Sequence, residues 1–425
     1  CTASGTTMTS QRRRVLMVAY HFPPLAGSSG IQRTLRFMQE LPSLGWEPLI
    51  LTADTRAYES TSEDLQRDVP AGTVVRRALA FDAARQLSVF GRYLDVTARP
   101  DRWISWRFDG VRQGMRMIRE FRPHAIWSTY PIATAHVIGA ALQRKSGLPW
   151  VADFRDPMAQ EGYPEDPRVW RSFQQIEGQA MTQARHAVFT TPSALRTYRD
   201  RYPDAKATLT LIENGYDEAS FQSVDGASGL DAPLTPGAVT LLHSGIVYPS
   251  ERDPTALFVA LGRLRKSGAI GPGRMRVRFR APVHEALLHR LAGEHDVADL
   301  IEVLPPVPYR EALQEMLRAD ALLVMQAANC NAQIPAKIYE YLRAARPVIC
   351  LADPAGDTEA VRRAAGVDAC ARLADADEIA ARLPDWLVRL QAGTMALPGP
   401  GAVKAASRQG RAQQLAQLLN AAVQP

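Results

Sequence analysis

The sequence predicts an α/β protein made of two doubly wound, Rossmann-like parallel-sheet domains. Three observations support this class. Short apolar runs alternate with helical periodicity over residues 14–191, the alternation starts again at residue 239, and residues 224–238 between the two halves have little periodic signal. Alternating strand and helix patterns are typical of βαβ units in a parallel sheet. A chain of 425 residues also exceeds what one hydrophobic core usually serves.

The first half opens with a buried strand. Residues 14–20 (RVLMVAY) are a continuous apolar run, residues 21–30 (HFPPLAGSSG) form a loop rich in Gly, Ser and Pro, and residues 31–45 have helical spacing. Further strands are expected at 47–53, 124–129, 149–154 and 187–191. Continuous apolar runs of this kind fit strands that are covered on both faces.

The second half repeats this order. Strands are expected at 239–245, 276–281, 301–306, 321–327 and 347–352. Helices are expected at 254–268, 284–295, 310–319, 335–345 and 357–366, and a final amphipathic helix in 407–425. We therefore expect an N-terminal domain over 8–222, a C-terminal domain over 239–405, and a helix in 406–425 that packs back toward the N-terminal domain.

The ligand site of such a protein has a predictable place. Doubly wound sheets bind ligands outside the carboxyl ends of their strands, so the two domains should face each other across a cleft that holds the site. Candidate residues should therefore lie in the loops that follow strands.

Composition bounds the class and the compartment. With 46% hydrophobic and 22% charged residues, the chain has a soluble, globular composition. The apolar run after residue 14 is too short for a signal peptide, and no stretch reads as a membrane span. Cys330, Cys350 and Cys370 have no CxxC spacing, so we expect reduced thiols, no metal site and a cytoplasmic protein.

The net charge of +6 is concentrated in one segment. Residues 99–124 contain seven arginines against three acidic residues. The apolar positions of the predicted helix should face a core: Val111, Met115 and Ile118. Its arginines then face outward: Arg112, Arg116 and Arg119. One interpretation of this arginine face is that it is simply solvated. The other is that it contacts anionic lipid at the inner face of the cell membrane, with Trp103 and Trp106 nearby. No nucleic-acid motif accompanies the charge, so we expect no nucleic-acid partner.

The helix predicted at 335–345 begins with an unusual residue. Pro335 suits a first helical position, so Lys337 falls in the first turn, where the helix dipole disfavours a cation by roughly a few tenths of a kcal/mol. Glu340 lies on the same face. One interpretation is a surface ion pair. The other is that Lys337 and backbone N–H groups bind a phosphate while Glu340 accepts a hydrogen bond from a sugar hydroxyl.

The loop after the strand at 239–245 repeats this arrangement. Ser244 and Gly245 end the strand, and Arg252 precedes a helix that Asp253 and Pro254 can start. Two cations at two helix starts that converge on one cleft favour a diphosphate site over two separate ion pairs.

Two glycines in the first half also precede a helix. Gly27 and Gly30 would let the backbone approach a ligand closely. Their spacing is not GxGxxG, so a Rossmann dinucleotide site is not predicted.

Six segments in this order resemble the family 4-type (GT4-like) retaining glycosyltransferases of the GT-B fold. They are MVAYHFPPLAGSSGIQRTLRF, GLPWVADFRDP, VFTTPSA, LIENGYD, HSGIVYPSERDP and IPAKIYEYLRAARPVI. Such enzymes move a sugar from a nucleotide diphosphate donor to an acceptor hydroxyl, without a bound metal or other cofactor, and retain the anomeric configuration. The resemblance implies a glycan or lipid-linked acceptor in bacterial polysaccharide synthesis.

The resemblance also implies residue roles on the donor side. Arg252 and Lys337 should contact the diphosphate and act in catalysis, and Glu340 should bind the ribose. The rest of the donor pocket should be formed by Gly27, Gly30, Ser244, Gly245 and Val307. Many relatives carry a glutamate where this chain has Ala332, and we expect Asn329, Asn331 or Gln333 to hydrogen-bond the donor sugar instead.

On the acceptor side the sequence leaves alternatives open. Asp156 either orients or deprotonates the acceptor, with Arg155 bound to it or to the substrate, or these two residues brace the loop as an ion pair. His136 is either an acceptor-side residue near the donor sugar or a core histidine, and His21 is equally ambiguous. Asn214 and Asp217 should belong to the interdomain hinge.

Two other functions remain open. A nucleotide-sugar epimerase shares the GT-B architecture, although its acid and histidine pattern is not visible here. A catalytically silent GT-B subunit that binds a glycan is suggested by Ala332 and opposed by Lys337, Arg252 and Glu340.

Overall fold

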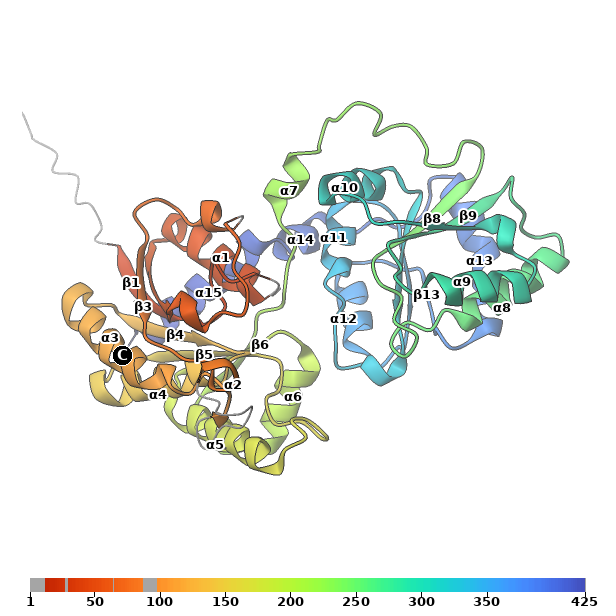
Figure 1. Ribbon diagram of the computed structural model, residues 1–425. Helices are drawn as coiled ribbons and strands as arrows, with labels where there is room; N and C mark the ends of the chain where they lie inside the picture. Colours follow the sequence, from red (N-terminus) through yellow and green to blue (C-terminus); the bar gives the residue numbers. More distant parts are fainter. Residues whose placement is uncertain (1–11, 27–29, 64, 87–97, 425) are drawn as a thin grey trace, which may run out of the picture. The chain divides into compact units, whose positions relative to one another are not determined.

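The computed structural model describes residues 12–26, 30–63, 65–86 and 98–424 (Figure 1). The chain divides into two compact units. The first unit contains the chain up to Glu213 together with Arg411–Pro425, and the second contains Asn214–Gly410. The chain therefore passes between the units at 213–214 and again at 410–411.

The first unit is built on a seven-stranded sheet with the order β3-β2-β1-β4-β5-β6-β7. All its strand pairs are parallel. The strands are β1 (Arg13–Val18), β2 (Trp46–Ala53), β3 (Val74–Ala78), β4 (Ala125–Thr129), β5 (Trp150–Arg155), β6 (His186–Phe189) and β7 (Thr208–Leu211). The order reverses between β1 and β4, and the carboxyl ends of the strands at such a point are where doubly wound sheets bind ligands.

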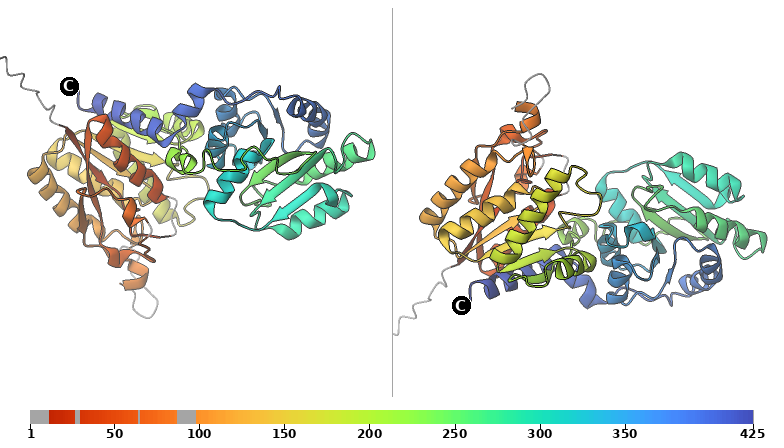
Figure 2. Two further views of the ribbon diagram at one scale, coloured as in Figure 1. Left: turned by 90° about the horizontal axis from the view of Figure 1, so that it is seen from above. Right: turned by 90° about the horizontal axis from the view of Figure 1, so that it is seen from below.

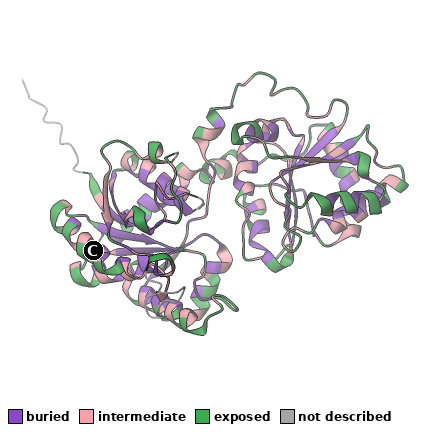
Figure 3. Cartoon of the chain, viewed as in Figure 1, coloured by how far each residue is buried: buried purple, intermediate pink, exposed green. Residues whose placement is uncertain are grey.

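Helices cover both faces of this sheet (Figure 2). One face packs against α1 (Gly30–Glu40) and α15 (Arg408–Ala422). The other packs against α3 (Trp106–Phe121), α4 (Thr134–Ser146), α5 (Pro167–Gln183) and α6 (Pro192–Arg201), and α2 (Ala83–Gln86) is a single turn. Side chains of β1 alternate between the two cores, Met17 to the first and Leu16 and Val18 to the second. The strand is therefore buried on both faces (Figure 3), as its continuous apolar run predicts.

The second unit contains a six-stranded parallel sheet with the order β10-β9-β8-β11-β12-β13. Its strands are β8 (Val239–Ser244), β9 (Met275–Arg280), β10 (Ile301–Leu304), β11 (Ala321–Gln326), β12 (Val348–Ala352) and β13 (Cys370–Ala371). The order reverses between β8 and β11, so a ligand site is expected at the carboxyl end of β8 in this sheet too.

Two sets of helices cover this second sheet. One face carries α8 (Thr255–Lys266), α9 (Glu285–Glu294) and α13 (Ala376–Gln391). The other carries α10 (Tyr309–Arg318), α11 (Lys337–Arg343) and α12 (Asp357–Ala364), with α7 (Glu218–Gln222) and α14 (Pro400–Ala405) packed beside them. Short 3-10 turns complete the chain: η1 (Leu41–Leu44), η2 (Thr55–Ala57), η3 (Gln66–Asp68), η5 (Ala298–Leu300) and η6 (Ala328–Cys330).

The predicted fold class, two doubly wound parallel sheets, is confirmed. Three strands were not predicted: β3, β7 and β13. All three lie at sheet edges and are short or only half buried, so they lack a continuous apolar run. Helix α13 was not predicted either.

The two segments that connect the units lie side by side. Tyr216 N donates to Ala406 O (3.1 Å), and Arg408 N donates to Tyr216 O (2.9 Å). Gly215 makes this approach possible, because a Cβ there would lie 2.5 Å from Ala406 O. Just beyond, Leu415 and Leu419 of α15 pack into the core of the first unit. The predicted hinge residues Asn214 and Asp217 both lie in the first connecting segment.

Within the described part of the chain, no helix has both the length and the apolar character needed to cross a membrane.

Candidate active site

In the first unit, three predicted residues meet at the carboxyl end of β1. His21 follows this strand, Gly30 begins α1, and Arg155 ends β5. A Cβ on Gly30 would lie 2.4 Å from His21 Nδ1 and 3.0 Å from Arg155 Nη1, so only glycine leaves room for both side chains. Gly27, predicted with Gly30, lies outside the described residues.

The electrostatics of this site keep His21 neutral. Burial, followed by the charge of Arg155, lowers the pKa of His21 to about 4. Burial, followed by the charge of Arg33, also lowers the pKa of Arg155. The Nε atom of Arg155 is buried and has no hydrogen-bond partner among the described residues. Arg155 is therefore a desolvated cation, and its Nε–H remains available as a hydrogen-bond donor. Such a side chain suits an anionic or hydroxylated ligand.

The loop after β5 is braced by a different ion pair from the one considered in the sequence. Arg33 of α1 donates to both carboxylate oxygens of Asp153 (2.7 and 3.2 Å), and both side chains are buried. Arg33 also donates to Ile212 O (2.9 Å), at the end of β7. Arg33–Asp153 thus fixes the ends of β5 and β7.

Asp156 is exposed at the carboxyl end of β5. Thr190 Oγ1 lies 3.3 Å from Asp156 Oδ1 and 3.0 Å from Arg155 O, while Thr190 N donates to Arg155 O (2.8 Å). Arg155 has a φ of 63°, a left-handed conformation that is uncommon for a residue with a side chain. This backbone directs Arg155 inward and leaves the Asp156 carboxylate accessible to a ligand.

Sequence reasoning missed Tyr130, which lies near Asp156, and Tyr163, which lies near Tyr130. Burial raises the pKa of Tyr130, and nearby Tyr163 and Asp156 raise it further. Tyr163 is 52% exposed. Its backbone is nevertheless fixed, because Gln160 N donates to Tyr163 O and Tyr163 N donates to Gln160 O. Tyr163 follows the end of β5 in the sequence, but the sequence shows neither that its ring is exposed nor that it lies near Tyr130.

His136 lies in the core of the first unit. Its side chain is fully buried in α4, and Nδ1 lies 2.8 Å from Ser128 Oγ, which also accepts from Trp150 Nε1 (2.8 Å). Burial lowers the pKa of His136 to about 3. This position supports the core-histidine interpretation and leaves no surface for contact with an acceptor.

In the second unit, predicted donor residues gather at the carboxyl end of β8. Ser244 N donates to Tyr341 Oη of α11 (2.8 Å), which fixes the end of the strand to this helix. Gly245 follows with a φ of 138°, and no atom lies within 4 Å of the position of a Cβ there. The backbone is therefore open to close approach at this point.

Lys337 is the first residue of α11, two positions after the predicted helix start, and it is paired. Its Nζ lies 2.6 Å from Glu340 Oε2, while Tyr309 Oη donates to Glu340 Oε1 (3.0 Å). The ion pair considered in the sequence is therefore present without a ligand. The side chain of Lys337 keeps 37% of its surface exposed, so it can still reach a ligand. Tyr309, which sequence reasoning missed, also connects Glu340 to the segment that contains Val307.

Arg252 lies on the other side of β8's carboxyl end. It donates to Ile246 O (2.7 Å), and its guanidinium lies 5.4 Å from the ring centroid of Tyr248. Burial lowers the pKa of the fully buried His243 to about 4, and the charges of Arg252 and Lys337 act in the same direction. Both predicted cations are therefore close enough to influence one side chain of β8.

The remaining predicted residues of this unit lie around η6. Asn329 Nδ2 donates to Ser250 O (2.9 Å), and Ala327 N donates to Glu251 O (2.7 Å), so this turn holds the loop that carries Arg252. Gln333 and Ala332 are exposed. A cavity of about 460 Å³ lies on the α8 and α13 side of the same sheet edge, and no predicted donor residue lines it.

Each unit therefore collects its own set of predicted residues. Residues of the first unit meet at the ends of β1 and β5: His21, Gly30, Arg155 and Asp156. Those of the second surround the end of β8 and the start of α11: Ser244, Gly245, Arg252, Lys337 and Glu340. In the described parts of both units, no group of three His, Cys, Asp or Glu side chains is arranged to hold a metal ion.

Comparisons with known proteins match this architecture. Residues 29–215 match the model of the glycosyl transferase 4-like domain. Similar solved structures include Anabaena Alr3699/HepE in complex with UDP, at 12% identity and a TM-score of 0.61, covering 96% of this chain and 100% of that one. An α,α-trehalose 6-phosphate synthase from Burkholderia multivorans follows at 13% identity and a TM-score of 0.60, with 96% of each chain covered. The comparison with curated proteins found no match.

A third similar structure is the sucrose-phosphate synthase of Thermosynechococcus elongatus, at 14% identity and a TM-score of 0.56, covering 96% of this chain and 99% of that one. The fold and these likenesses define the class: the chain has the two-domain GT-B fold of glycosyltransferases. Within its N-terminal unit, residues 29–215 match the glycosyl transferase 4-like domain, so the predicted resemblance to GT4-like glycosyltransferases is confirmed over this part of the chain.

Proposed function

We propose that the protein is a retaining, metal-independent glycosyltransferase that moves a sugar from a nucleotide diphosphate sugar to an acceptor hydroxyl. The observation that carries the proposal is the pair of cations at the end of β8, Arg252 and Lys337, with Glu340 beside Lys337. Phosphates attract both cations, and the Glu340 carboxylate can accept hydrogen bonds from ribose hydroxyls. Anabaena HepE, which shares the fold, was solved with UDP bound.

The charges suit the chemistry of sugar transfer. Cleavage of the anomeric bond leaves positive charge on the sugar and additional negative charge on the diphosphate. Arg252 and Lys337 would stabilise that negative charge as it develops, which is the role of preorganised electrostatics and the one a metal ion has in other transferases. In the free protein Lys337 binds Glu340, so donor binding exchanges this pair for phosphate and ribose contacts.

The acceptor side of the proposal rests on Asp156 and Arg155. Asp156 would accept the proton of the acceptor hydroxyl or orient that hydroxyl, while the departing phosphate oxygen can also take the proton. Tyr163 is 52% exposed and lies near Tyr130, whose pKa the charge of Asp156 also raises. An exposed aromatic ring and an exposed carboxylate around the same tyrosine suit a sugar, because such a ring packs on sugar C–H groups and a carboxylate accepts from hydroxyls. We therefore propose a glycan acceptor, free or lipid-linked, in polysaccharide synthesis.

The test is incubation with a panel of nucleotide sugars, with nucleoside diphosphate release and sugar products measured separately. The proposal expects release that requires Lys337 and increases with an acceptor. Conversion of the donor to an epimer without release of a nucleoside diphosphate would favour the nucleotide-sugar epimerase instead. Nucleotide-sugar binding without turnover would indicate a silent subunit.

A second proposal concerns attachment to the inner face of the cell membrane. Trp106 is fully buried and Trp103 packs against the core, so the two tryptophans named in the sequence are not the contact. Phe108 is 73% exposed, and Arg112, Arg116 and Arg119 follow it at helical spacing on the outer surface of α3. An exposed aromatic ring followed by arginines suits an anionic lipid surface.

Cosedimentation with vesicles tests this attachment. Binding to vesicles of phosphatidylglycerol should exceed binding to phosphatidylcholine at low salt, and Phe108→Ser should weaken it. Equal sedimentation with both vesicles would overturn the attachment without affecting the transferase proposal.

A further inference from the structure

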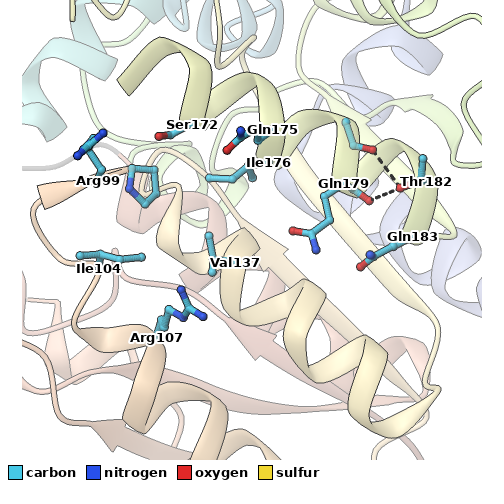
Figure 4. A pocket seen from close by; sticks show the side chains of 12 residues that line it. Arg99, Ile104, Arg107, Val137, Ser172, Gln175, Ile176, Gln179, Thr182 and Gln183 are labelled. Atoms are coloured by element: carbon cyan, nitrogen blue, oxygen red, sulfur yellow. Dashed lines mark hydrogen bonds between the residues drawn. The ribbon is translucent and has the colours of Figure 1, made fainter. Parts of the chain in front are cut away.

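A second cavity lies in the first unit, away from the candidate active site. It has a volume of about 610 Å³ and is bounded by α5, the start of α4 and the segment 99–107 (Figure 4). None of the residues assigned to donor or acceptor lines it. The volume lies within the range of about 300–1,000 Å³ that is usual for small-molecule sites.

The charged residues of this cavity are all cations. Arg99 and Arg107 line it, and no carboxylate does among the lining residues that the structure describes. Arg107 is exposed, its guanidinium lies 5.4 Å from the ring centroid of Phe108, and no carboxylate forms an ion pair with it among the residues that the structure describes. Arg107 therefore places on the cavity wall a positive charge that no carboxylate of the described lining residues neutralises, and this charge should attract an anion.

Helix α5 lines the opposite wall with amide side chains. Gln175, Gln179 and Gln183 recur every four residues, so they share one face, and Figure 4 shows them along the cavity. The Oε1 atom of Gln183 is buried and has no hydrogen-bond partner in the described structure. A buried acceptor without a donor is unfavourable, so a ligand hydroxyl toward which the Gln183 amide turns would gain binding energy by donating to this oxygen.

Between these walls the cavity surface is apolar. Ile104, Val137 and Ile176 contribute to it. Such a surface can pack against the C–H face of a sugar ring or against a glycerol backbone.

We propose that this cavity binds a phosphate ester that carries free hydroxyl groups. Arginine binds phosphate through paired, charge-assisted hydrogen bonds, and glutamine amides both donate to and accept from hydroxyls. A neutral sugar would use the amides but leave Arg107 without a partner, and inorganic phosphate would leave Gln183 without one. The ester is either a soluble sugar phosphate or the polar headgroup of an anionic glycerolipid, since both present the same groups.

Calorimetric titration of the full chain with glucose 6-phosphate tests the proposal. The Lys337→Ala background removes binding of the probe at the donor site. We expect saturable binding in this background, and Arg107→Gln or Gln183→Leu should weaken it about tenfold or more. Glucose and inorganic phosphate should each bind more weakly than the ester. For this titration Arg112→Gln is the matched control, because this arginine lies five residues further along α3 and does not line the cavity; it is not used with vesicles, since it belongs to the proposed membrane surface.

A second arm distinguishes the source of the ester. If it is a headgroup, Arg107→Gln should reduce sedimentation with phosphatidylglycerol vesicles, and glucose 6-phosphate should compete. Binding of glucose 6-phosphate that vesicles do not displace would identify a soluble ester, which equally supports the proposal. The proposal would be overturned if Arg107→Gln and Arg112→Gln bound glucose 6-phosphate equally well. It would also be overturned if the protein bound neither glucose 6-phosphate nor phosphatidylglycerol vesicles.

Discussion

Lys337 decides between the two interpretations of α11. Lys337→Ala should lower sugar transfer roughly 100- to 1,000-fold, because loss of one preorganised donor to a developing charge costs about 2.7–4 kcal/mol. Stability should change by less than about 1 kcal/mol, since the ion pair with Glu340 is partly exposed. Nucleoside diphosphate release and the melting temperature are the measurements, with the exposed Lys266→Ala as control. Near-normal transfer in Lys337→Ala would assign the residue to the ion pair alone.

Asp156 separates acceptor chemistry from donor binding. Asp156→Asn keeps the size of the side chain and its contact with Thr190, but it removes the charge that would accept a proton. We expect turnover to fall about 100-fold or more, as for loss of a general base, while nucleotide affinity stays the same. Steady-state kinetics and nucleotide titration measure both quantities. Asp200→Asn, an exposed change in α6, is the control, and unchanged turnover in Asp156→Asn would exclude the role.

His136 should make the stability of the first unit depend on pH. Burial lowers its folded-state pKa to about 3, so below the unfolded pKa of about 6.5 only the unfolded state takes up the proton. The free energy of unfolding should therefore fall by about 1.4 kcal/mol per pH unit from this residue as the pH drops below about 6.5. Urea unfolding at pH 7 and pH 5 should differ by about 2 kcal/mol less in His136→Gln than in the wild type. An identical pH dependence in both proteins would show that folding does not lower the pKa of His136.

At the scale of elements, β9 makes ion pairs with a neighbouring helix that its alternating strand pattern does not predict. Val277 and Phe279 face the core shared with α8 and α9, so the alternating arginines lie on the opposite face, toward α10. There Glu315 of α10 accepts from Arg280 (2.7 and 2.8 Å) and Arg278 (3.0 Å). Ion pairs therefore replace much of the apolar packing between β9 and α10. The sequence predicts the strand but does not show which helix neutralises its arginines.

Glu315→Gln should destabilise the second unit by on the order of 3 kcal/mol, because it leaves two largely buried arginines without their shared carboxylate. Burial alone would raise the pKa of Glu315, but hydrogen bonds and charge from Arg280, and then from Arg278, lower it. The wild type should therefore lose this contribution as the pH falls through the lowered folded-state pKa, below the ordinary glutamate range. Glu294→Gln is the control, since its pair with Arg290 is exposed and should matter little. Equal unfolding free energies for the two variants at pH 7 would contradict the role of Glu315.

Whether a strand can be predicted from the sequence depends on whether both of its faces are buried by apolar residues. Central strands such as β1, β4 and β11 are continuous apolar runs because both of their faces are buried, so the sequence identifies them. Edge strands such as β3 have half-buried residues and charged side chains, and their pattern resembles that of a loop. Ion pairs between distant elements are not predictable from spacing, since Arg33 and Asp153 are separated by 120 residues.

For the whole molecule, the sequence predicted where the candidate site lies better than how its residues are connected. Doubly wound topology brings the carboxyl ends of the strands together, which is why Gly30, Asp156 and Ser244 could be named in advance as candidate residues at these ends. Tyr163 and Phe108 could not be given a place, because exposure depends on packing that no local pattern encodes. His136 was named as a candidate but lies in the core, since a histidine on a helix near a strand end can face either the site or the core.

Gly215 tests how the chain connects its two units. A Cβ at this position would lie 2.5 Å from Ala406 O, and a backbone atom cannot move aside as a flexible side chain can. Gly215→Ala should therefore separate the two connecting segments and weaken the hydrogen bonds of Tyr216 with Ala406 and Arg408. We expect a loss of about 2–4 kcal/mol, from overpacking together with the weakened hydrogen bonds.

Gly178→Ala in α5 is the matched control for this change. A Cβ at Gly178 meets only Tyr202 Cε1, at 3.8 Å, and alanine in a helix is more stable than glycine by about 0.5–1 kcal/mol. The two variants make the same chemical change, so they should shift the melting temperature in opposite directions, Gly215→Ala downward and Gly178→Ala upward. Equal melting temperatures would mean that the two segments do not approach each other as closely as their hydrogen bonds require.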